Sequence, residues 1–311
     1  MADAQGRAAG GGLILWATWT GKDHISVKRT TRNLLLSICL VLVQAGAGAG
    51  TVVSVTFDSA QLRRNWNYDV YLPTGYESKR LRYPVLYLLH GNGGSRTDWP
   101  IKGRLQGTLD QLIASGAMPP AIVVMPDGGR SWYVDRTEPM ESAIVQDLLP
   151  EVEKRFRSLQ ERDGRLLAGH STGAYGAFRL VMKYPDRFAA AALMSPALYA
   201  GLPPKTSTAV ASGVFGENGG FDPKVWNDLN YPAAWDAYIA KKRPVPVFLS
   251  SGDDDLDILQ GSYDLYRKLI STGQPAEYRV IDGGHQWTSW TPMSADAFTY
   301  IFRFARRPTV E

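Results

Sequence analysis

Short apolar segments recur along most of the chain, and their spacing restricts the folds it can adopt. Such runs are typical of strands that are covered on both faces of a mainly parallel sheet. Strands are predicted at residues 51–57, 67–72, 85–89, 121–125, 166–168, 190–194, 245–249 and 277–281, and helices at 105–114, 141–156, 172–184 and 257–271. The first two strands alternate polar and apolar residues, as half-buried antiparallel strands do. Alternating strands and helices predict a doubly wound α/β sheet.

One segment interrupts this alternation. Residues 196–231 are rich in Gly, Pro, Ser and Asn. We interpret them as an insertion over the carboxyl edge of the sheet, where long connections often carry function. A plain surface loop explains the same composition equally well. Residues 50–311, which include this segment, are predicted to form one catalytic domain.

The first 49 residues have the features of a leader. Lys28, Arg29 and Arg32 precede an apolar run at residues 34–43, and small residues follow at 45–50. This order is typical of a secretory signal peptide, predicted at residues 27–49, with translation starting near Val27. A membrane anchor is the alternative, although a spanning helix needs about 20 apolar residues. We therefore expect a secreted or periplasmic protein without stable membrane insertion after processing.

The charge and the cysteine content exclude some functions. Five of the 34 basic residues and two of the 30 acidic residues lie before residue 50, so the rest of the chain holds 29 basic and 28 acidic residues. This balance gives no electrostatic reason to expect nucleic-acid binding. The only cysteine, Cys39, lies in the leader, and no histidine or cysteine cluster is present. We expect no cofactor and no metal.

The segment from Gly169 to Gly173 has the pattern G-x-S-x-G, with Ser171 at its centre. A predicted strand precedes it and a predicted helix follows it. This context is typical of the nucleophile elbow, in which a strained turn exposes the serine hydroxyl. Ser171 is therefore the predicted nucleophile.

A serine hydroxyl needs an adjacent base to be nucleophilic near neutral pH. Of the four histidines, His285 is the candidate base, because it follows the last predicted strand on a glycine-rich loop. The predicted acid is Asp255, three residues after Gly252, which gives the chain order Ser, Asp, His of the α/β-hydrolase fold. Asp254 is the main alternative to Asp255, and the neighbouring carboxylates also compete, namely Asp253 and Asp257.

A glycine-rich segment follows the predicted strand at residues 85–89. It runs from His90 to Gly94, and glycine allows the backbone to approach a ligand closely. Backbone N–H groups aimed at a developing oxyanion supply much of the rate of acyl transfer. The predicted oxyanion hole consists of the N–H groups of Asn92 and Thr172. The segment does not match a phosphate-binding loop.

Taken together, these motifs resemble the esterase D-like family of α/β hydrolases, which includes feruloyl esterases, enterochelin-type esterases, S-formylglutathione hydrolases and mycolyltransferases. The resemblance covers roughly residues 52–307 and departs from many members at Ala174. It is carried by residues 87–91 with 98–99, 125–129, 169–173 with 184–188, and 283–287. It implies that the loop with Ser131, Trp132 and Tyr133 lines the acyl pocket.

The resemblance implies a serine carboxylesterase that works through an acyl-enzyme. Trp132, Tyr133 and Trp287 are the predicted substrate-binding residues, and aromatic side chains there suit a feruloyl or cinnamoyl ester, although such residues often belong to the core. The expected partner is a small-molecule or cell-wall ester. An acyltransferase of the mycolyltransferase type is one alternative, and a non-catalytic binding protein on a hydrolase scaffold is another.

Overall fold

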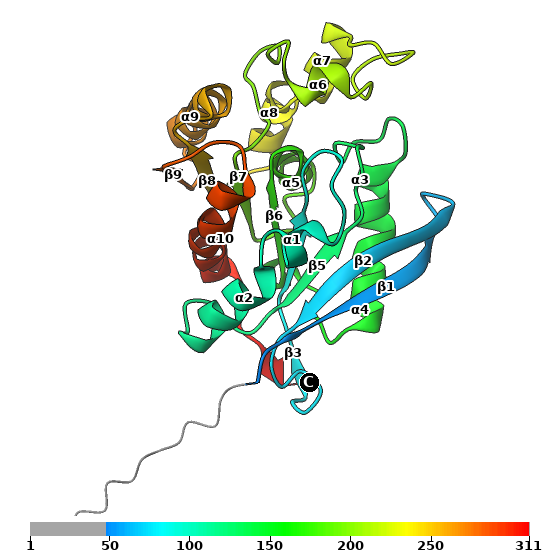
Figure 1. The fold of residues 1–311 in the computed structure, drawn as a ribbon, viewed down its shortest axis with the longest axis vertical. Coiled ribbons are helices and arrows are strands. Elements are labelled where there is room, and N and C mark those ends of the chain that lie inside the picture. Colours follow the sequence, from blue (N-terminus) through cyan, green and yellow to red (C-terminus); the bar gives the residue numbers. More distant parts are fainter. Residues whose placement is uncertain (1–47, 311) are drawn as a thin grey trace, which may run out of the picture. The chain divides into compact units, whose positions relative to one another are not determined.

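The computed structural model describes residues 48–310, and Figure 1 shows their fold. The predicted leader lies outside these residues except for its last two. Eight strands form one sheet in the order β1(Thr51–Ser59), β2(Arg64–Leu72), β5(Ile122–Pro126), β4(Val85–Leu89), β6(Arg165–His170), β7(Ala190–Met194), β8(Val247–Gly252) and β9(Ala276–Ile281). A two-stranded sheet pairs β10(Thr309–Val310) with β3(Leu81–Arg82).

The direction of the strands follows their burial. All residues of β4, β5, β6, β7 and β8 are buried, and these strands run parallel with β9. β1 and β2 are antiparallel to each other, and β2 is antiparallel to β5. On β1, Val55 and Phe57 pack against the core, whereas Ser54 and Thr56 are exposed. The predicted mainly parallel sheet with two antiparallel strands is confirmed.

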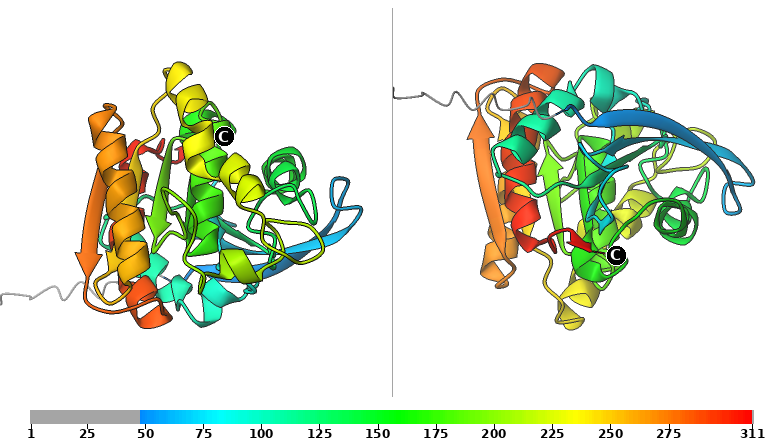
Figure 2. Two further views of the ribbon diagram at one scale, coloured as in Figure 1. Left: turned by 90° about the horizontal axis from the view of Figure 1, so that it is seen from above. Right: turned by 90° about the horizontal axis from the view of Figure 1, so that it is seen from below.

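Helices cover both faces of the sheet, as the two views of Figure 2 show. One core cluster includes side chains of α2(Leu105–Ala114) and α10(Trp287–Ile301). The cluster on the other face involves α3(Met140–Ala143), α4(Leu149–Arg155), α5(Thr172–Lys183), α8(Tyr231–Ala240) and α9(Leu256–Ser271). The helix predicted at residues 141–156 is divided by a π-helical turn at Ile144–Leu148. The sheet is therefore buried on both sides, as its apolar strands require.

The segment at residues 196–231 contains two short helices, α6(Thr208–Ala211) and α7(Pro223–Leu229). Buried aromatic rings attach it to the rest of the domain. The ring centroids of Trp226 and Phe215 are 4.8 Å apart, and Phe215 is 5.0 Å from Trp132. Trp132 in turn contacts Tyr175 of α5 at 5.3 Å. The insertion is thus anchored through a hydrophobic core that it shares with Trp132 and α5.

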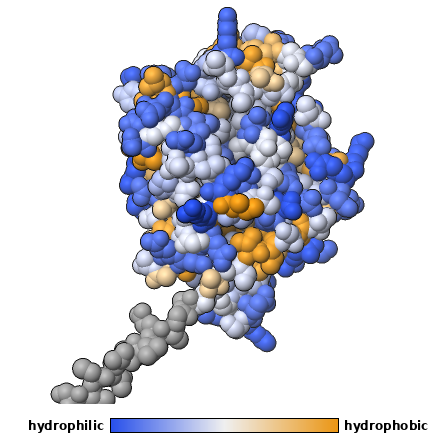
Figure 3. Space-filling model, in the orientation of Figure 1, coloured by the Kyte–Doolittle hydropathy of each residue, from blue (hydrophilic) through white to orange (hydrophobic). Residues whose placement is uncertain are grey.

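Polar residues predominate on the face drawn in Figure 3, with hydrophobic residues in separate patches between them. None of the helices in residues 48–310 is long and apolar enough to cross a membrane. The short α1(Asp98–Ile101) and the loops after β4, β6, β8 and β9 lie at the carboxyl edge of the parallel strands. In open α/β sheets, ligands bind in crevices at this edge.

Candidate active site

Ser171 lies in the turn between β6 and α5. Its φ of 54° and ψ of −121° are a strained conformation for a non-glycine residue. The flanking glycines make the turn possible. A Cβ atom on Gly173 would lie 2.5 Å from the carbonyl oxygens of Leu89 and His90, and one on Gly169 would lie 2.5 Å from the backbone of Gly173. Close packing against β4 therefore fixes the serine at the edge of the sheet.

His285 approaches Ser171 from the loop between β9 and α10. Its Nε2 lies 2.8 Å from the Ser171 Oγ, and its Nδ1 lies 2.6 Å from Oδ2 of Asp255. Ser171, His285 and Asp255 therefore form one continuous chain of hydrogen bonds. This arrangement allows the imidazole to accept the serine proton while the carboxylate stabilises the imidazolium.

The other carboxylates after β8 point elsewhere. Asp253 accepts a hydrogen bond from the N–H of Gly283 at 2.9 Å and so holds the loop that carries His285. Asp254 and Asp257 are exposed, and neither makes a side-chain hydrogen bond within residues 48–310. The side chain of Asp255, in contrast, is only 15% exposed. Of the four candidates, Asp255 alone contacts His285.

The loop after β4 carries the predicted oxyanion donors. Asn92 lines a cavity together with Ser171, and Thr172 is the first residue of α5. N–H groups in the first turn of a helix have no partners within the helix, so they are available to an anion. Asn92 and Thr172 thus both lie beside Ser171, and their role as oxyanion donors stays a prediction.

Two buried histidines hold this loop in place. His90 accepts a hydrogen bond from the N–H of Gly128 at its Nε2, 2.8 Å away, and its Nδ1 contacts the Gly91 carbonyl oxygen at 2.7 Å. The N–H of Gly91 donates to Nε2 of His170 at 3.2 Å. Burial lowers the pKa of His90, and it lowers the pKa of His170 well below the ordinary value. Both rings are therefore neutral and position the backbone.

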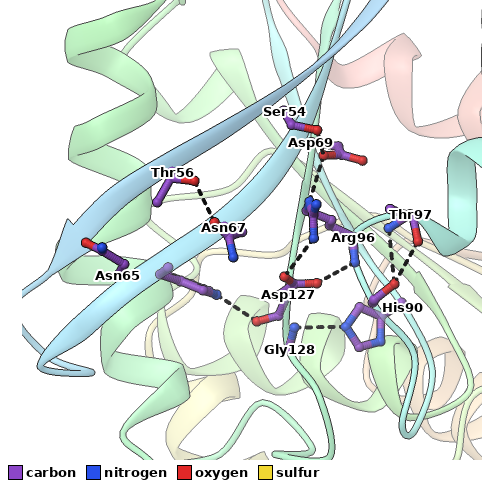
Figure 4. A network of polar contacts seen from close by, with 12 residues as sticks. Ser54, Thr56, Asn65, Asn67, Asp69, His90, Arg96, Thr97, Asp127 and Gly128 are labelled. Carbon is purple, nitrogen blue, oxygen red and sulfur yellow. Dashed lines mark hydrogen bonds and ion pairs between the residues drawn. The ribbon is translucent and has the colours of Figure 1, made fainter.

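Figure 4 shows a polar network that continues from this loop to β2. The Nε of Arg96 donates to Asp69 at 2.9 Å, and its backbone N–H donates to Asp127 at 2.7 Å. Ser54 of β1 donates to the same Asp69 at 2.7 Å. Asp69 has a side chain that is 6% exposed, so its charge requires such partners. The network joins the loop after β4 to β2 and to the end of β5.

Two cavities open beside Ser171, and His285 and Thr208 line both. The first, here called the oxyanion cavity, has a volume of about 290 Å³. Its other lining residues are Gly91, Asn92, Gly93, Gly94, Asp98, Lys102, His170, Trp287 and Trp290. The second, here called the hydroxyl cavity, has a volume of about 210 Å³. Its other lining residues are Ala197, Tyr199, Pro204, Thr206, Ser207, Asp255, Asp257 and Ile258.

The aromatic residues predicted to bind substrate occupy different places. Trp287 lines the oxyanion cavity, and its ring contacts that of Trp99 at 5.1 Å. Trp132 and Tyr133 are 1% and 2% exposed and line neither cavity. Trp132 packs in the aromatic core of the insertion, and the hydroxyl of Tyr133 donates to the His90 carbonyl oxygen at 2.9 Å. The expectation that the loop with Ser131, Trp132 and Tyr133 lines the acyl pocket is therefore wrong for Trp132 and Tyr133.

Some lining residues were not predicted. Thr208, Tyr199 and Thr206 come from the insertion, where composition indicated a loop but no position within it. Arg96 has no local sequence signal at all, since its partners lie 27 and 31 residues away along the chain. Within the described part of the chain, no group of three or more His, Cys, Asp or Glu side chains is arranged to hold a metal ion.

Comparison with known proteins identifies relatives. A family described as "Putative esterase" matches residues 59–300. An acetyl esterase of Caldicellulosiruptor saccharolyticus is 27% identical over 80% of this chain and 97% of its own length. An endo-1,4-beta-xylanase/feruloyl esterase of Xylanibacter ruminicola is 33% identical over 48% of this chain, which corresponds to only 22% of that larger protein.

Solved structures agree on the fold. A ferulic acid esterase superposes with a TM-score of 0.71 at 28% identity, covering 82% of this chain and 99% of its own. An S-formylglutathione hydrolase from Staphylococcus aureus superposes with a TM-score of 0.66 at 18% identity, covering 82% of this chain and 98% of its own. The family match spans most of the chain, and the sheet order and the elbow are those of an α/β hydrolase. The chain therefore belongs to this esterase family of α/β hydrolases, a family of carboxylic ester hydrolases.

Proposed function

We propose that the chain hydrolyses carboxylic esters with Ser171 as nucleophile, His285 as general base and Asp255 as the supporting acid. The observation that carries this proposal is the chain of two short contacts, 2.6 Å from Asp255 to His285 and 2.8 Å from His285 to Ser171. It ends at a serine that lines two cavities. A nucleophile hydrogen-bonded to an oriented base is the arrangement that acyl transfer requires.

The reaction has two steps. His285 takes the proton of Ser171 as the oxygen attacks the ester carbonyl, and the N–H groups of Asn92 and Thr172 stabilise the oxyanion. His285 then protonates the leaving alcohol, which leaves an acyl-enzyme on Ser171. Water, activated by the same histidine, attacks the acyl-enzyme and releases the acid. Asp255 stabilises the imidazolium in both steps.

We place the acyl group in the oxyanion cavity. The carbonyl carbon must lie beside the oxyanion donors, and the indole rings of Trp287 and Trp290 form an apolar wall there. Flat rings pack well against such a wall. This cavity, together with the similarity to a ferulic acid esterase, favours aromatic acyl groups such as feruloyl, whereas the similarity to an acetyl esterase favours a short acyl group.

The decisive experiment replaces the nucleophile. Ser171→Ala is expected to lose on the order of 10⁴-fold or more in kcat on 4-nitrophenyl esters, because the acyl-enzyme cannot form. The unfolding free energy should stay close to that of the parent protein, and a fluorophosphonate should label the parent but not the variant. Near-parental activity in the variant would refute the proposal, and a parent that is neither active nor labelled would favour a binding protein.

A panel of acetyl, butyryl and feruloyl esters decides between short and aromatic acyl groups, and product analysis with added alcohol measures acyl transfer against hydrolysis.

Export through the predicted signal peptide is tested by the N-terminal sequence of the secreted product, which should begin near residue 50.

A further inference from the structure

The loop after β5 holds two neighbouring residues in a conformation that is rare for residues with a side chain. Trp132 and Tyr133 have φ angles of 54° and 57°, in the left-handed region that favours glycine, and both are buried. Such strain persists only where the surrounding structure enforces it, and it is concentrated at functional sites. Neither side chain lines a cavity beside Ser171, so substrate contact does not explain the strain.

The side chain of Tyr133 is packed between two glycines. A Cβ atom on Gly128 would lie 2.4 Å from the Tyr133 ring, and one on Gly176 of α5 would lie 2.5 Å from the Tyr133 Cβ. The Tyr133 N–H donates to the Oγ of Ser131 at 3.1 Å, and that hydroxyl donates to the Gly128 carbonyl oxygen at 2.6 Å. The ring is therefore held in one position, which also fixes the place of its hydroxyl.

This hydroxyl contacts the loop after β4. It donates to the His90 carbonyl oxygen at 2.9 Å. Burial raises the pKa of Tyr133 well above its usual range, so the hydroxyl keeps its proton and remains a donor. The N–H of the same peptide group, which belongs to Gly91, donates to Nε2 of His170 at 3.2 Å. The peptide group between His90 and Gly91 is therefore held at both of its polar atoms by side chains of other segments.

The next peptide group carries the proposed oxyanion donor, the N–H of Asn92. Its carbonyl oxygen, that of Gly91, accepts a hydrogen bond from the Gly94 N–H at 3.1 Å. The Asn92 N–H itself has no hydrogen-bond partner in the described part of the chain, so it is available to a ligand. Peptide groups are planar, and only the φ and ψ of Gly91 separate this one from the peptide group that Tyr133 holds. Glycine has wide conformational freedom, so contacts on both sides must fix these angles.

We infer that Tyr133 is a positioning residue, which directs the Asn92 N–H at the oxyanion by holding the His90 carbonyl group. The inference rests on the proposed ester hydrolysis and adds to it a residue that touches neither the substrate nor the reacting atoms. Outright removal of one oxyanion donor costs about 10²–10³-fold in kcat. A donor that remains but is less well directed should cost less, about tenfold, because the rate depends steeply on geometry in the bound complex.

The test is Tyr133→Phe, which keeps the ring and removes only the hydroxyl. On 4-nitrophenyl acetate, kcat and kcat/KM should fall equally, about tenfold, as they do when an interaction made only in the transition state is weakened. Trifluoroacetophenone forms a tetrahedral adduct with a nucleophilic serine and places an oxyanion beside the same N–H groups. Its inhibition constant should rise about tenfold as well, because the adduct resembles the transition state.

A second variant disturbs the same ring in another way. Ser131→Ala removes the acceptor of the Tyr133 N–H and leaves the phenol in place. It should lower kcat and weaken the ketone by a smaller factor than Tyr133→Phe does.

Tyr175→Phe is the matched control. Tyr175 is buried as deeply, and its hydroxyl also donates to a backbone carbonyl oxygen, that of Leu229 at 2.7 Å, away from the loop after β4. It should lose stability to urea as Tyr133→Phe does, while kcat and the inhibition constant stay close to the parental values.

An effect on both readouts beyond that of the control, in either variant, supports the inference, and its absence in both variants overturns it. A parent protein that hydrolyses no ester would instead contradict the proposed function, so the two failures are distinguishable.

Discussion

At the scale of single residues, three consecutive carboxylates after β8 have different contacts. Asp255 reaches His285, Asp253 holds Gly283, and Asp254 is exposed. Side chains of neighbouring residues in a turn point in different directions, so only one of them can orient the imidazole. This difference allows a direct comparison within one segment.

Asp255→Asn is expected to lower kcat/KM on the order of 10⁴-fold, because the charge that stabilises the imidazolium is lost and the wrong tautomer is favoured. Asp254→Asn should have a mild effect, since the side chain makes no contact with His285. Asp253→Asn should also be mild, because an amide oxygen can still accept from Gly283. Kinetics on one simple ester check all three. If Asp254→Asn lost most of its kcat/KM and Asp255→Asn did not, the assigned acid would be wrong.

His170 is a second residue for which a measurement is expected to show an effect, here on the pH dependence of folding stability. Burial lowers its pKa well below the ordinary value, whereas an exposed histidine in the unfolded chain titrates at about pH 6.5. The unfolded state therefore binds more protons below this pH, and folding stability falls as the pH falls. The free energy of unfolding in urea should be lower at pH 5 than at pH 7.

Other groups contribute to that pH dependence, so a variant isolates the part due to His170. In His170→Gln the amide can still accept from the Gly91 N–H, but it does not titrate. The drop between pH 7 and pH 5 should therefore be smaller in the variant than in the parent. An equal drop in both proteins would show that His170 is protonated in the folded state as readily as in the unfolded one.

At the scale of elements, the loops at the carboxyl edge are held by polar contacts between segments rather than within them. Arg96 is the clearest case, because it joins the loop after β4 to Asp69 and Asp127. Its guanidinium neutralises Asp69, whose side chain is only 6% exposed. Arg64 makes a comparable contact with Glu138, but there both side chains are more than 40% exposed.

Arg96→Met is expected to lower the free energy of unfolding by about 1–3 kcal/mol, because a buried carboxylate loses a charged partner. It should also lower kcat, since the loop that carries Asn92 becomes less well positioned. Arg64→Met, the control, should cost less than about 1 kcal/mol, as exposed ion pairs do. Urea unfolding and ester kinetics measure both. Equal costs for the two variants would show that the Arg96 contacts do not hold the loop.

At the scale of the whole molecule, the aromatic core under the insertion determines the shape of the hydroxyl cavity. Trp226 lies at its centre, is fully buried, and contacts the rings of Phe215 and Tyr175. Tyr199, which lines the hydroxyl cavity, contacts the ring of Trp226 at 6.1 Å, and Ala209, next to Thr208, is buried in the same core. The wall of the cavity therefore depends on packing between segments far apart in the sequence.

Trp226→Ala should cost about 3–5 kcal/mol of stability, because a large buried side chain leaves a cavity. It should also make residues 201–222 more susceptible to limited proteolysis than the rest of the domain. Trp226→Phe should show both effects to a smaller extent. Unchanged proteolysis of this segment in both variants would show that the insertion is held by other contacts.

Features that depend on local interactions could be predicted from the amino-acid sequence alone. Apolar runs of strand length gave the buried parallel strands, since a strand covered on both faces must be apolar throughout. The glycines around Ser171 indicated the tight turn, because only glycine fits against the carbonyl oxygens of β4. Ser171, Asp255 and His285 follow β6, β8 and β9, and these positions indicated that they meet, because parallel strands end at one edge.

Features that depend on packing between distant segments could be seen only in the folded chain. Trp132 and Tyr133 are aromatic, as residues of a substrate pocket often are. They lie in the core, because the insertion and α5 close over them. Thr208 lines the same cavity as Ser171, although the two residues are 37 positions apart in the sequence. No sequence periodicity marks the position of Thr208. Asp255 differs from its neighbours only in the direction that the turn gives its side chain. Side-chain direction and burial are set by contacts across the fold, and a local pattern does not contain them.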